Sequence, residues 1–426
     1  MRLTILNQFY VPDISPTAHL AASLARRMAA DGHAVTVVAS RGGYVAASAE
    51  ERRSDEGNPR VYRVWTPRLG KATVLKRCID YATFYLLALW RILTLPPQDA
   101  IVSLTTPPYI AWAALLHKVL HPSTRVVLWN MDCYPELAER SGKLNPTGPL
   151  SRAMRFLNRA MFRRIDHLVC LDTAMVDLLM SQYAPSEKTL PVTVIPNWED
   201  ASFFPDPAST PAPPPWPDAE ALGLRGKFVV LYLGNMGYGH RFETVLDAAD
   251  QMRGEPVVFL FIGGGSRFEP TKAEAQRRGL ANFVMRGYVP KQQTPSVMAA
   301  ADCALITLRD EILGVMSPSK LHSNLAMRLP VAYVGPATSN VDDAIRDFGC
   351  GASLRHGDAS GLAAFIRRLM ADRAEHARLR DAARRAFDLA YNDAVTLPRF
   401  GRVLDETVRH HADQSRPATS AAGEAA

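Results

Sequence analysis

Short apolar runs rich in β-branched residues alternate along this chain with longer stretches of helical periodicity. Such runs, bounded by turn residues, predict buried strands, and their alternation with helices is typical of βαβ units in a parallel α/β sheet. The predicted strands are LTILNQ, AVTVVAS, RVYRVW, AIVSLTT, TRVVLWN, HLVCLD and TVIPN in the first half, and FVVLYLG, VVFLFIG, FVMRGYV, CALITL, PVAYVG and a weaker GASL in the second half.

A proline-rich segment, PDPASTPAPPPWP at residues 205–217, separates the two halves. It is too rich in proline for a helix or a sheet interior. A chain of 426 residues also exceeds what one hydrophobic core usually serves. The predicted divisions are a domain over 1–204, a linker over 205–218, a second domain over 219–390, a helix that can pack back on the first domain over 391–411, and a disordered tail over 412–426.

Two segments have the composition of helices that can rest on a membrane surface. Residues 81–95 (YATFYLLALWRILTL) are interrupted by Arg91 and fall short of the roughly 20 residues that a spanning helix needs. Residues 151–164 (SRAMRFLNRAMFRR) place arginines at helical spacing opposite Met154, Leu157 and Met161. An interfacial helix is one interpretation of each segment, and an ordinary core helix or solvated face is the other.

The net charge limits the classes of binding partner, and the cysteine content limits the cellular compartment. The net charge of +7 and the pI of 9.2 favour an anionic partner, although scattered arginine is also typical of solvated helices. No nucleic-acid recognition module is visible. The five cysteines are odd in number and lack C-x-x-C spacing, which argues against a zinc site or a disulfide framework and favours the cytoplasm.

Three loops between residues 229 and 325 have the composition of phosphate-binding turns. They are Gly234-Asn235-Met236-Gly237 and Gly263-Gly264-Gly265, each after a predicted strand, and Ser317-Pro318-Ser319-Lys320, before a helical stretch. Ligands of parallel α/β sheets bind beyond the carboxyl ends of the strands, where glycine lets the backbone approach and helix N-termini face anions. Three such loops, one with a lysine, predict a nucleotide-sugar pocket.

The order of the motifs resembles that of the retaining, nucleotide-sugar-dependent glycosyltransferases of the GT-B architecture, in the family 4-like branch that builds bacterial O-antigen and exopolysaccharide. The resemblance covers nearly the whole chain. It implies two Rossmann-like domains facing a central cleft, with the donor on the C-terminal domain and the acceptor on the N-terminal one. It rests on NQFYVPD, SPTAHLAASLARRMAADGHAVTVV, WNMDCYPELAERSGKL, VIPNWED, LYLGNMGYGHRFETVLDAA, FIGGGSRF, MRGYVP and SPSKLHSNLAMRLPVAYVGP.

The resemblance also assigns the donor site. Lys320 is expected to be the catalytic cation that stabilises the leaving diphosphate, with Arg241 adding charge and His240 as an exposed neighbour. The turn at 287–290 is expected to contact the nucleobase, and a purely structural turn is the alternative. The two loop serines can also act as helix N-caps. The predicted donor-binding residues are Gly234, Asn235, Gly237, Arg241, Gly263, Gly287, Val289, Ser317, Ser319, Lys320, Leu321 and Ser323.

Two positions depart from the family pattern. Relatives commonly have a glutamate that holds the ribose where this chain has Ser323, and many have a second one facing the donor sugar where it has Val315. A serine hydroxyl lacks the charge-assisted strength of a carboxylate. The donor is then either held differently, with Asp310 or Glu311, or bound more weakly, and a noncatalytic descendant is a further alternative.

The acceptor side is expected on the N-terminal domain. Asp13, Pro16 and Thr17 lie in the loop after the first predicted strand, which approaches the donor phosphate and the acceptor in relatives. Asp132 and Glu136 are the catalytic carboxylate candidates; Asp132 is expected to contact the donor sugar or acceptor hydroxyl, and a helix cap is its alternative role. Their i, i+4 spacing fits one helix face, although the proline between them favours a turn or a helix start.

The sequence therefore predicts a cytoplasmic glycosyltransferase, peripherally bound to the inner face of the cytoplasmic membrane. It is expected to transfer a sugar from a UDP- or GDP-sugar to a lipid-linked saccharide with retention, without a metal or another cofactor, since no Asp-x-Asp motif is present. A nucleotide-sugar epimerase of similar shape and a noncatalytic membrane-associated scaffold are the alternatives. A dinucleotide oxidoreductase is disfavoured because the G-x-G-x-x-G turn is missing.

Overall fold

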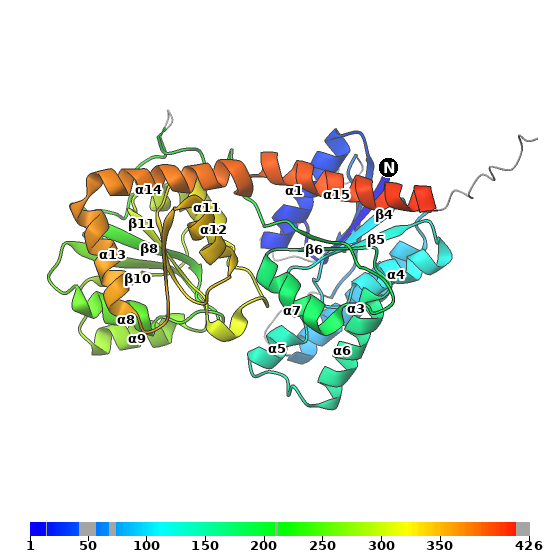
Figure 1. Cartoon of the computed structure of the whole chain (residues 1–426), viewed down its shortest axis with the longest axis horizontal. Helices are drawn as coiled ribbons and strands as arrows, with labels where there is room; N and C mark the ends of the chain where they lie inside the picture. The colour runs from blue at the N-terminus through cyan, green and yellow to red at the C-terminus, as the bar shows by residue number, and fades with distance from the viewer. Residues whose placement is uncertain (14, 42–56, 68–73, 209–211, 415–426) are drawn as a thin grey trace, which may run out of the picture.

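The computed structural model describes residues 1–13, 15–41, 57–67, 74–208 and 212–414, which form two α/β domains lying side by side (Figure 1). Within these residues, the N-terminal sheet has seven parallel strands in the order β3-β2-β1-β4-β5-β6-β7. The strands are β1 (Arg2–Leu6), β2 (Ala34–Ser40), β3 (Arg60–Val64), β4 (Ala100–Ser103), β5 (Arg125–Trp129), β6 (His167–Cys170) and β7 (Val192–Val194).

The C-terminal sheet has six described strands, also parallel, in the order β10-β9-β8-β11-β12-β13. They are β8 (Phe228–Asn235), β9 (Val257–Gly264), β10 (Phe283–Arg286), β11 (Cys303–Thr307), β12 (Val331–Val334) and β13 (Gly351–Leu354). Each predicted apolar run overlaps one of these strands, so the predicted fold class of two Rossmann-like domains is confirmed. Strand order reverses between β1 and β4 and between β8 and β11, and these crevices are where parallel sheets bind ligands.

Helices cover both faces of each sheet, which explains why central strands such as β5 and β11 are buried along their full length. The N-terminal domain contains α1 (Pro16–Ala30), α3 (Val74–Leu93), α4 (Ala111–Leu120), α5 (Glu136–Arg140), α6 (Pro149–Phe162) and α7 (Thr173–Tyr183). The C-terminal domain contains α8 (Glu243–Gln251), α9 (Phe268–Arg277), α10 (Thr294–Ala299), α11 (Lys320–Ala326), α12 (Asn340–Phe348), α13 (Ala359–Ala371) and α14 (Arg373–Ala386), with short helices η1 (Lys291–Gln293) and η2 (Asp310–Ile312).

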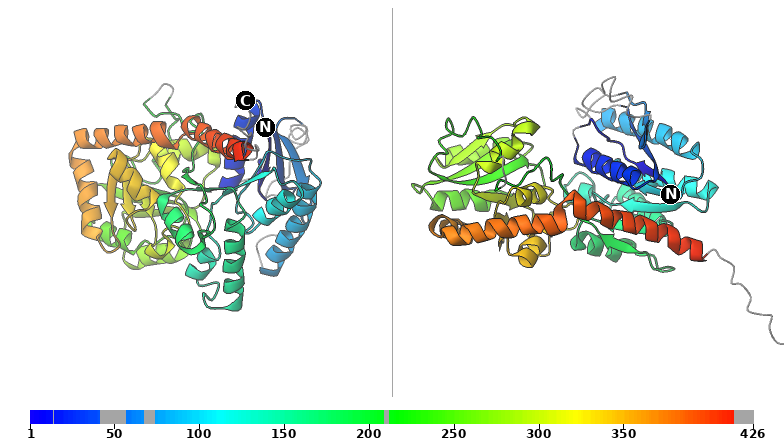
Figure 2. Two further views of the ribbon diagram at one scale, coloured as in Figure 1. Left: turned by 45° about the vertical axis from the view of Figure 1, so that its right-hand side comes forward. Right: turned by 90° about the horizontal axis from the view of Figure 1, so that it is seen from above.

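The C-terminal helices join the two domains. After α14, a π-helical turn (Phe387–Tyr391) leads into α15 (Asp393–Gln414), which runs along the N-terminal domain (Figure 2). Phe400 of α15 meets Trp129 of β5 at a ring distance of 4.8 Å, and Trp129 in turn stacks on Trp198 at 5.4 Å. This aromatic cluster anchors the crossing helix on the first sheet. The remainder of the predicted tail, 415–426, lies outside the described residues.

Candidate active site

The first two glycine loops contact each other at the carboxyl ends of β8 and β9. The two strands remain paired as far as Asn235 and Gly264. Gly263 has a φ of +148°, and a Cβ atom at this position would overlap the carbonyl oxygen of Gly234. Glycine is therefore required at 263 by both backbone conformation and space.

The lysine of the third loop reaches across to the first one. Lys320 is the first residue of α11, and its Nζ lies 3.3 Å from the Asn235 carbonyl oxygen and 3.2 Å from Nε2 of His240. The ammonium also lies 4.9 Å from the centroid of the Tyr232 ring, within range of a cation–π contact. The structure thus brings the three predicted loops together around one cation.

Burial sets the charge states of this pair. It lowers the pKa of Lys320 to about 8, so that the ammonium is still mostly charged at neutral pH. Burial, followed by the charge of Lys320, lowers the pKa of His240 to about 3, so that the imidazole is neutral. The expectation that His240 is an exposed neighbour was wrong, because its side chain is only 6% exposed and packs under the loop.

The other predicted donor residues of α11 and its loop differ in accessibility. Ser317 hydrogen-bonds the Asp172 carboxylate of the opposite domain. Ser319 occupies the N-cap position without a side-chain cap bond, so the capping alternative is not realised in this structure. Ser323 donates to the Lys320 carbonyl at 3.3 Å. Leu321 is fully buried, and only its backbone can therefore face a donor.

Arg241 and the turn after β10 are the remaining predicted donor-binding positions. Arg241 precedes α8 rather than lying in its first turn, and it pairs with Glu311 at 3.7 Å. Gly287 has open space where a Cβ would project, while the 68% exposed Tyr288 extends toward Gly264. Val289 is partly buried in the same turn. The turn that is predicted to contact the nucleobase thus lies next to the second glycine loop.

The loop before Ser317 makes hydrogen bonds to the N-terminal domain. Val315 is fully buried, and its carbonyl accepts from the Cys133 amide at 3.0 Å. Arg140 of α5 donates to the carbonyl of Leu313 at 2.9 Å, and its own carbonyl accepts from the Tyr238 hydroxyl at 2.7 Å. At the position where many relatives have a glutamate, this chain therefore has a buried valine that packs between the domains.

The two catalytic carboxylate candidates of the N-terminal domain are in different environments. Asp132 follows β5, its backbone amide bonds Thr105 Oγ1 at 3.2 Å, and burial raises the pKa of its carboxyl to about 6. Glu136 begins α5, directly after Pro135, and is only 2% exposed. It accepts a hydrogen bond from Tyr183 within the domain core. The structure therefore does not place Glu136 in the cleft. The prediction that this residue contacts the substrate was wrong, because its carboxylate bonds Tyr183 inside the domain.

The acceptor-side candidates surround the start of α1. Pro16 is the first residue of the helix and is exposed, and Thr17 exchanges a hydrogen bond with Ser15 at 3.0 Å. Asp13 is buried, with only 2% of its surface exposed. Of these three candidates, only Pro16 lines the cavity between the domains.

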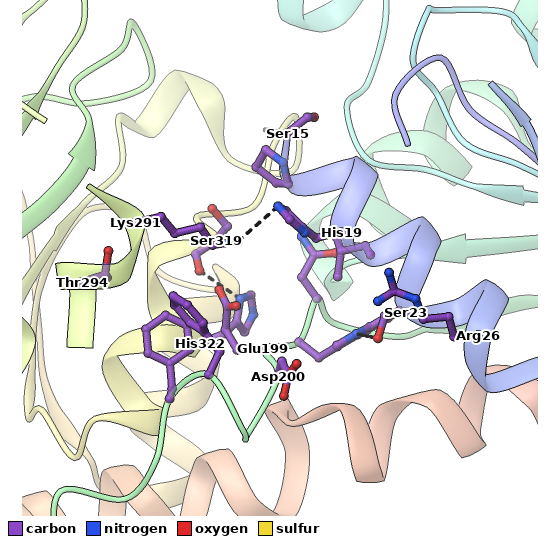
Figure 3. Close-up of a pocket in the computed structure, with 16 residues that line it drawn as sticks. Ser15, His19, Ser23, Arg26, Glu199, Asp200, Lys291, Thr294, Ser319 and His322 are labelled. Atoms are coloured by element: carbon purple, nitrogen blue, oxygen red, sulfur yellow. Dashed lines mark hydrogen bonds between the residues drawn. The ribbon is translucent and has the colours of Figure 1, made fainter. Parts of the chain in front are cut away.

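A cavity of about 400 Å³ lies at the junction of the two domains (Figure 3). Its walls come from α1, the segment 197–204, the start of α10 with η1, and the start of α11. His19 Nε2 lies 3.1 Å from Lys291 Nζ across the junction. Glu199 is part of the cavity wall, and burial raises the pKa of its carboxyl to about 7. His322 also lines the cavity; its side chain is buried, and its Nδ1 lies 3.0 Å from the Ser319 carbonyl oxygen. These residues could not be predicted as a group from the sequence, because they come from four separate segments without a shared motif.

Comparisons with known proteins agree with this geometry. Residues 17–198 match the glycosyl transferase 4-like domain, and residues 217–386 match the glycosyl transferases group 1 family. Each match falls on one of the two domains. The chain is therefore a glycosyltransferase with the GT-B fold.

Two curated relatives are similar over a large part of the chain. A protein of Escherichia coli (strain K12) named as a colanic acid biosynthesis glycosyl transferase, WcaI, is 22% identical over 77% of this chain and 81% of its own length. WbjE of Pseudomonas aeruginosa, named as a glycosyltransferase, is 27% identical over 56% of this chain and 58% of its own length.

Solved structures share the architecture. Sucrose-phosphate synthase from Thermosynechococcus elongatus superposes with a TM-score of 0.70 at 14% identity, covering 97% of this chain and all of that chain. Anabaena HepE in complex with UDP-glucose gives a TM-score of 0.64 at 14% identity, covering 95% of this chain and all of that chain. At this level of identity, the likeness shows the fold alone.

Proposed function

We propose that this glycosyltransferase transfers a sugar from a nucleoside diphosphate onto a lipid-linked saccharide during the assembly of a cell-surface polysaccharide. The observation that carries the proposal is the Lys320 ammonium, held over the Gly234 loop where the helix α11 begins. A diphosphate leaving group needs such a fixed cation, because negative charge develops on its oxygen as the bond to the sugar breaks. The name of WcaI and the UDP-glucose bound to HepE support the donor and the pathway class.

The transfer is proposed to retain the anomeric configuration. The acceptor hydroxyl oxygen attacks the anomeric carbon from the face that the diphosphate leaves, and the departing phosphate oxygen takes the hydroxyl proton. This route needs no dedicated protein base, which fits the burial of Glu136 against Tyr183, away from the cleft. Asp132 is proposed to hydrogen-bond the donor sugar or the acceptor hydroxyl from the end of β5.

A membrane surface is proposed on the N-terminal domain. Within the described residues, no helix is both long and apolar enough to cross a bilayer. The helices α3 and α4 contact each other, as do α4 and α6. Their exposed apolar side chains are Ile79, Leu86 and Trp90 on α3, Leu116, Val119 and Leu120 on α4, and Leu150, Phe156 and Leu157 on α6.

Basic residues accompany these apolar side chains on α6. Phe156 is 68% exposed and lies between Arg152 and Arg159, which are also exposed and spaced at i−4 and i+3 on the same helical face. The sequence predicted a face of arginines opposite the apolar side of this helix. That separation is incomplete, because the exposed Phe156 lies between two of the arginines. Exposed apolar and aromatic side chains beside arginines are the combination that a helix resting on anionic lipid needs, because the apolar groups enter the headgroup boundary and the arginines attract the lipid charge.

The transfer experiment uses the full chain, radiolabelled UDP- and GDP-sugars and lipid-linked saccharides extracted from membranes. We expect label in the lipid phase, and the coupling constant of the product anomeric proton should show the donor configuration. An isomerised nucleotide sugar formed from donor alone would instead indicate an epimerase. Nucleotide binding without transfer to any extracted lipid would indicate a noncatalytic scaffold.

A further inference from the structure

The tautomer of His240 is fixed by its two neighbours. Nδ1 lies 2.7 Å from the Thr307 carbonyl oxygen at the end of β11. A carbonyl oxygen can only accept, so Nδ1 carries the proton and Nε2 presents a lone pair. Nε2 lies 3.2 Å from the Lys320 ammonium, which can only donate. The imidazole therefore links the third loop to the sheet through one donated and one accepted hydrogen bond.

The surroundings keep this ring in place and neutral. Tyr232 meets the ring edge-on at 5.7 Å, and Phe242 stacks at 6.2 Å. The ring also borders a cavity of about 180 Å³. The charged residues lining that cavity are Arg241, Arg267 and Arg309, with Glu243 and Glu274. Burial and the nearby cation favour the uncharged imidazole, which remains a hydrogen-bond acceptor throughout the usual assay range.

The Lys320 ammonium has three N–H donors, and two of them are engaged within the protein. One is directed to the Asn235 carbonyl at 3.3 Å and one to His240 Nε2 at 3.2 Å. The stem crosses Gly234 so closely that a Cβ there would lie 3.2 Å from Lys320 Cε. Among the contacts of the described residues, one N–H and the positive charge thus remain for a ligand at the first loop. The flexible lysine side chain is thus held in place by Gly234, the Asn235 carbonyl and the His240 imidazole.

We propose that His240 is a positioning residue for sugar transfer: its Nε2 holds the Lys320 ammonium charged and directed at the donor diphosphate. This inference rests on the proposed function, since it requires Lys320 to bind that diphosphate. His240 itself contacts no reacting atom in this scheme. It acts by orienting the ammonium before the donor arrives, so that no reorganisation is needed as charge develops.

Two substitutions separate positioning from packing. His240→Asn keeps an amide that can donate to Thr307 but removes the acceptor at Nε2. His240→Gln places a carbonyl oxygen near the Nε2 position and loses the bond to Thr307. We expect His240→Asn to lower kcat about tenfold and His240→Gln to remain within about threefold of wild type. A purely structural role predicts the reverse order, and that order would overturn the proposal.

The pH profile provides a readout that packing alone does not move. The hydrogen bond to neutral His240 stabilises the charged form of Lys320, so its loss lowers the pKa of the lysine further. The alkaline limb of kcat/KM is therefore expected to shift to lower pH in His240→Asn and not in His240→Gln. An unshifted limb in a folded His240→Asn variant, with folding checked by thermal unfolding, contradicts the proposal. If His240→Asn does not fold, a fall in kcat of more than about threefold in His240→Gln contradicts the proposal instead.

A third variant distinguishes failure of this inference from failure of the proposed function. If Lys320→Met transfers sugar at the wild-type rate, the donor assignment itself is wrong. If Lys320→Met is impaired while His240→Asn is not, only the positioning role is wrong. Under the proposal, His240→Asn adds no further loss in the Lys320→Met background, because the two residues act through the same ammonium.

Discussion

Replacing Lys320 by methionine removes the charge and retains most of the stem that packs over Gly234. At a separation of about 4 Å and an effective dielectric constant of about 20, an ammonium and a phosphate oxygen attract by about 4 kcal/mol. The bound diphosphate is already charged, so part of this energy is uniform binding that affects KM rather than kcat. We therefore expect kcat to fall by about tenfold to a hundredfold, which corresponds to about 1.4–2.7 kcal/mol.

The same substitution should not weaken the fold. Burial lowers the pKa of Lys320 from 10.5 to about 8, a change that corresponds to a cost of about 3 kcal/mol for the charged side chain. Part of the side chain is exposed, so a gain of about 1–2 kcal/mol in the free energy of unfolding is expected at pH 7. The cost is fully present below pH 8 and disappears as pH rises toward 10.5. The advantage of the variant should therefore shrink with rising pH.

The assays are initial transfer rates and denaturant unfolding at pH 7 and pH 10. A nucleoside diphosphate should raise the Tm of the wild type more than that of Lys320→Met, because the ligand binds the native state through the missing charge. Near-wild-type turnover would refute the reasoning. Lost turnover together with a destabilisation above about 1 kcal/mol would show that Lys320 is a structural residue, and this outcome is equally fatal to the assignment.

Three further predictions test other parts of the molecule. Because burial raises the pKa of Asp132 to about 6, kcat/KM should fall as pH drops below 6 and the carboxyl becomes protonated; Asp132→Asn should remove this acid limb, and an unchanged limb assigns it elsewhere. Gly263→Ala should lower the free energy of unfolding by about 2–4 kcal/mol through overlap with the Gly234 carbonyl, whereas Gly287→Ala, with open space, should stay within about 0.5 kcal/mol. Phe156→Ser should reduce flotation with anionic vesicles, and Leu389→Ser, equally exposed near the domain crossing, should not; equal loss in both variants would contradict the α6 surface.

The sequence predicted the strands well because their signal is local. A buried parallel strand is a continuous apolar run, and runs such as VVLYL and VVFLFI cannot be confused with amphipathic helices of the same length. The glycine loops were recognisable for a similar reason. Gly263 is required by its own φ and by the close approach of the Gly234 carbonyl, and both requirements belong to its position at the carboxyl end of β9.

Individual side chains of the site were predicted less well. His240 looked exposed because it follows a glycine-rich loop, yet the loop folds it under Lys320 and against β11. Glu136 looked available because it follows a strand end, yet α5 turns it toward Tyr183. In both cases, the direction of the side chain depends on a partner more than 40 residues away, and no periodicity in the sequence encodes that direction.

The sequence by itself determined two parallel α/β domains and the glycine and lysine loops at the strand ends, because apolar runs and turn residues act over a few neighbouring positions. Only the tertiary structure decided which groups face each other. The Lys320–His240 pair joins residues from two loops, and the cavity with His19 and Lys291 joins two domains. Such contacts depend on how the strands are ordered in each sheet and how α15 ties the domains together. Their free energies become available only after the chain has closed over those distances.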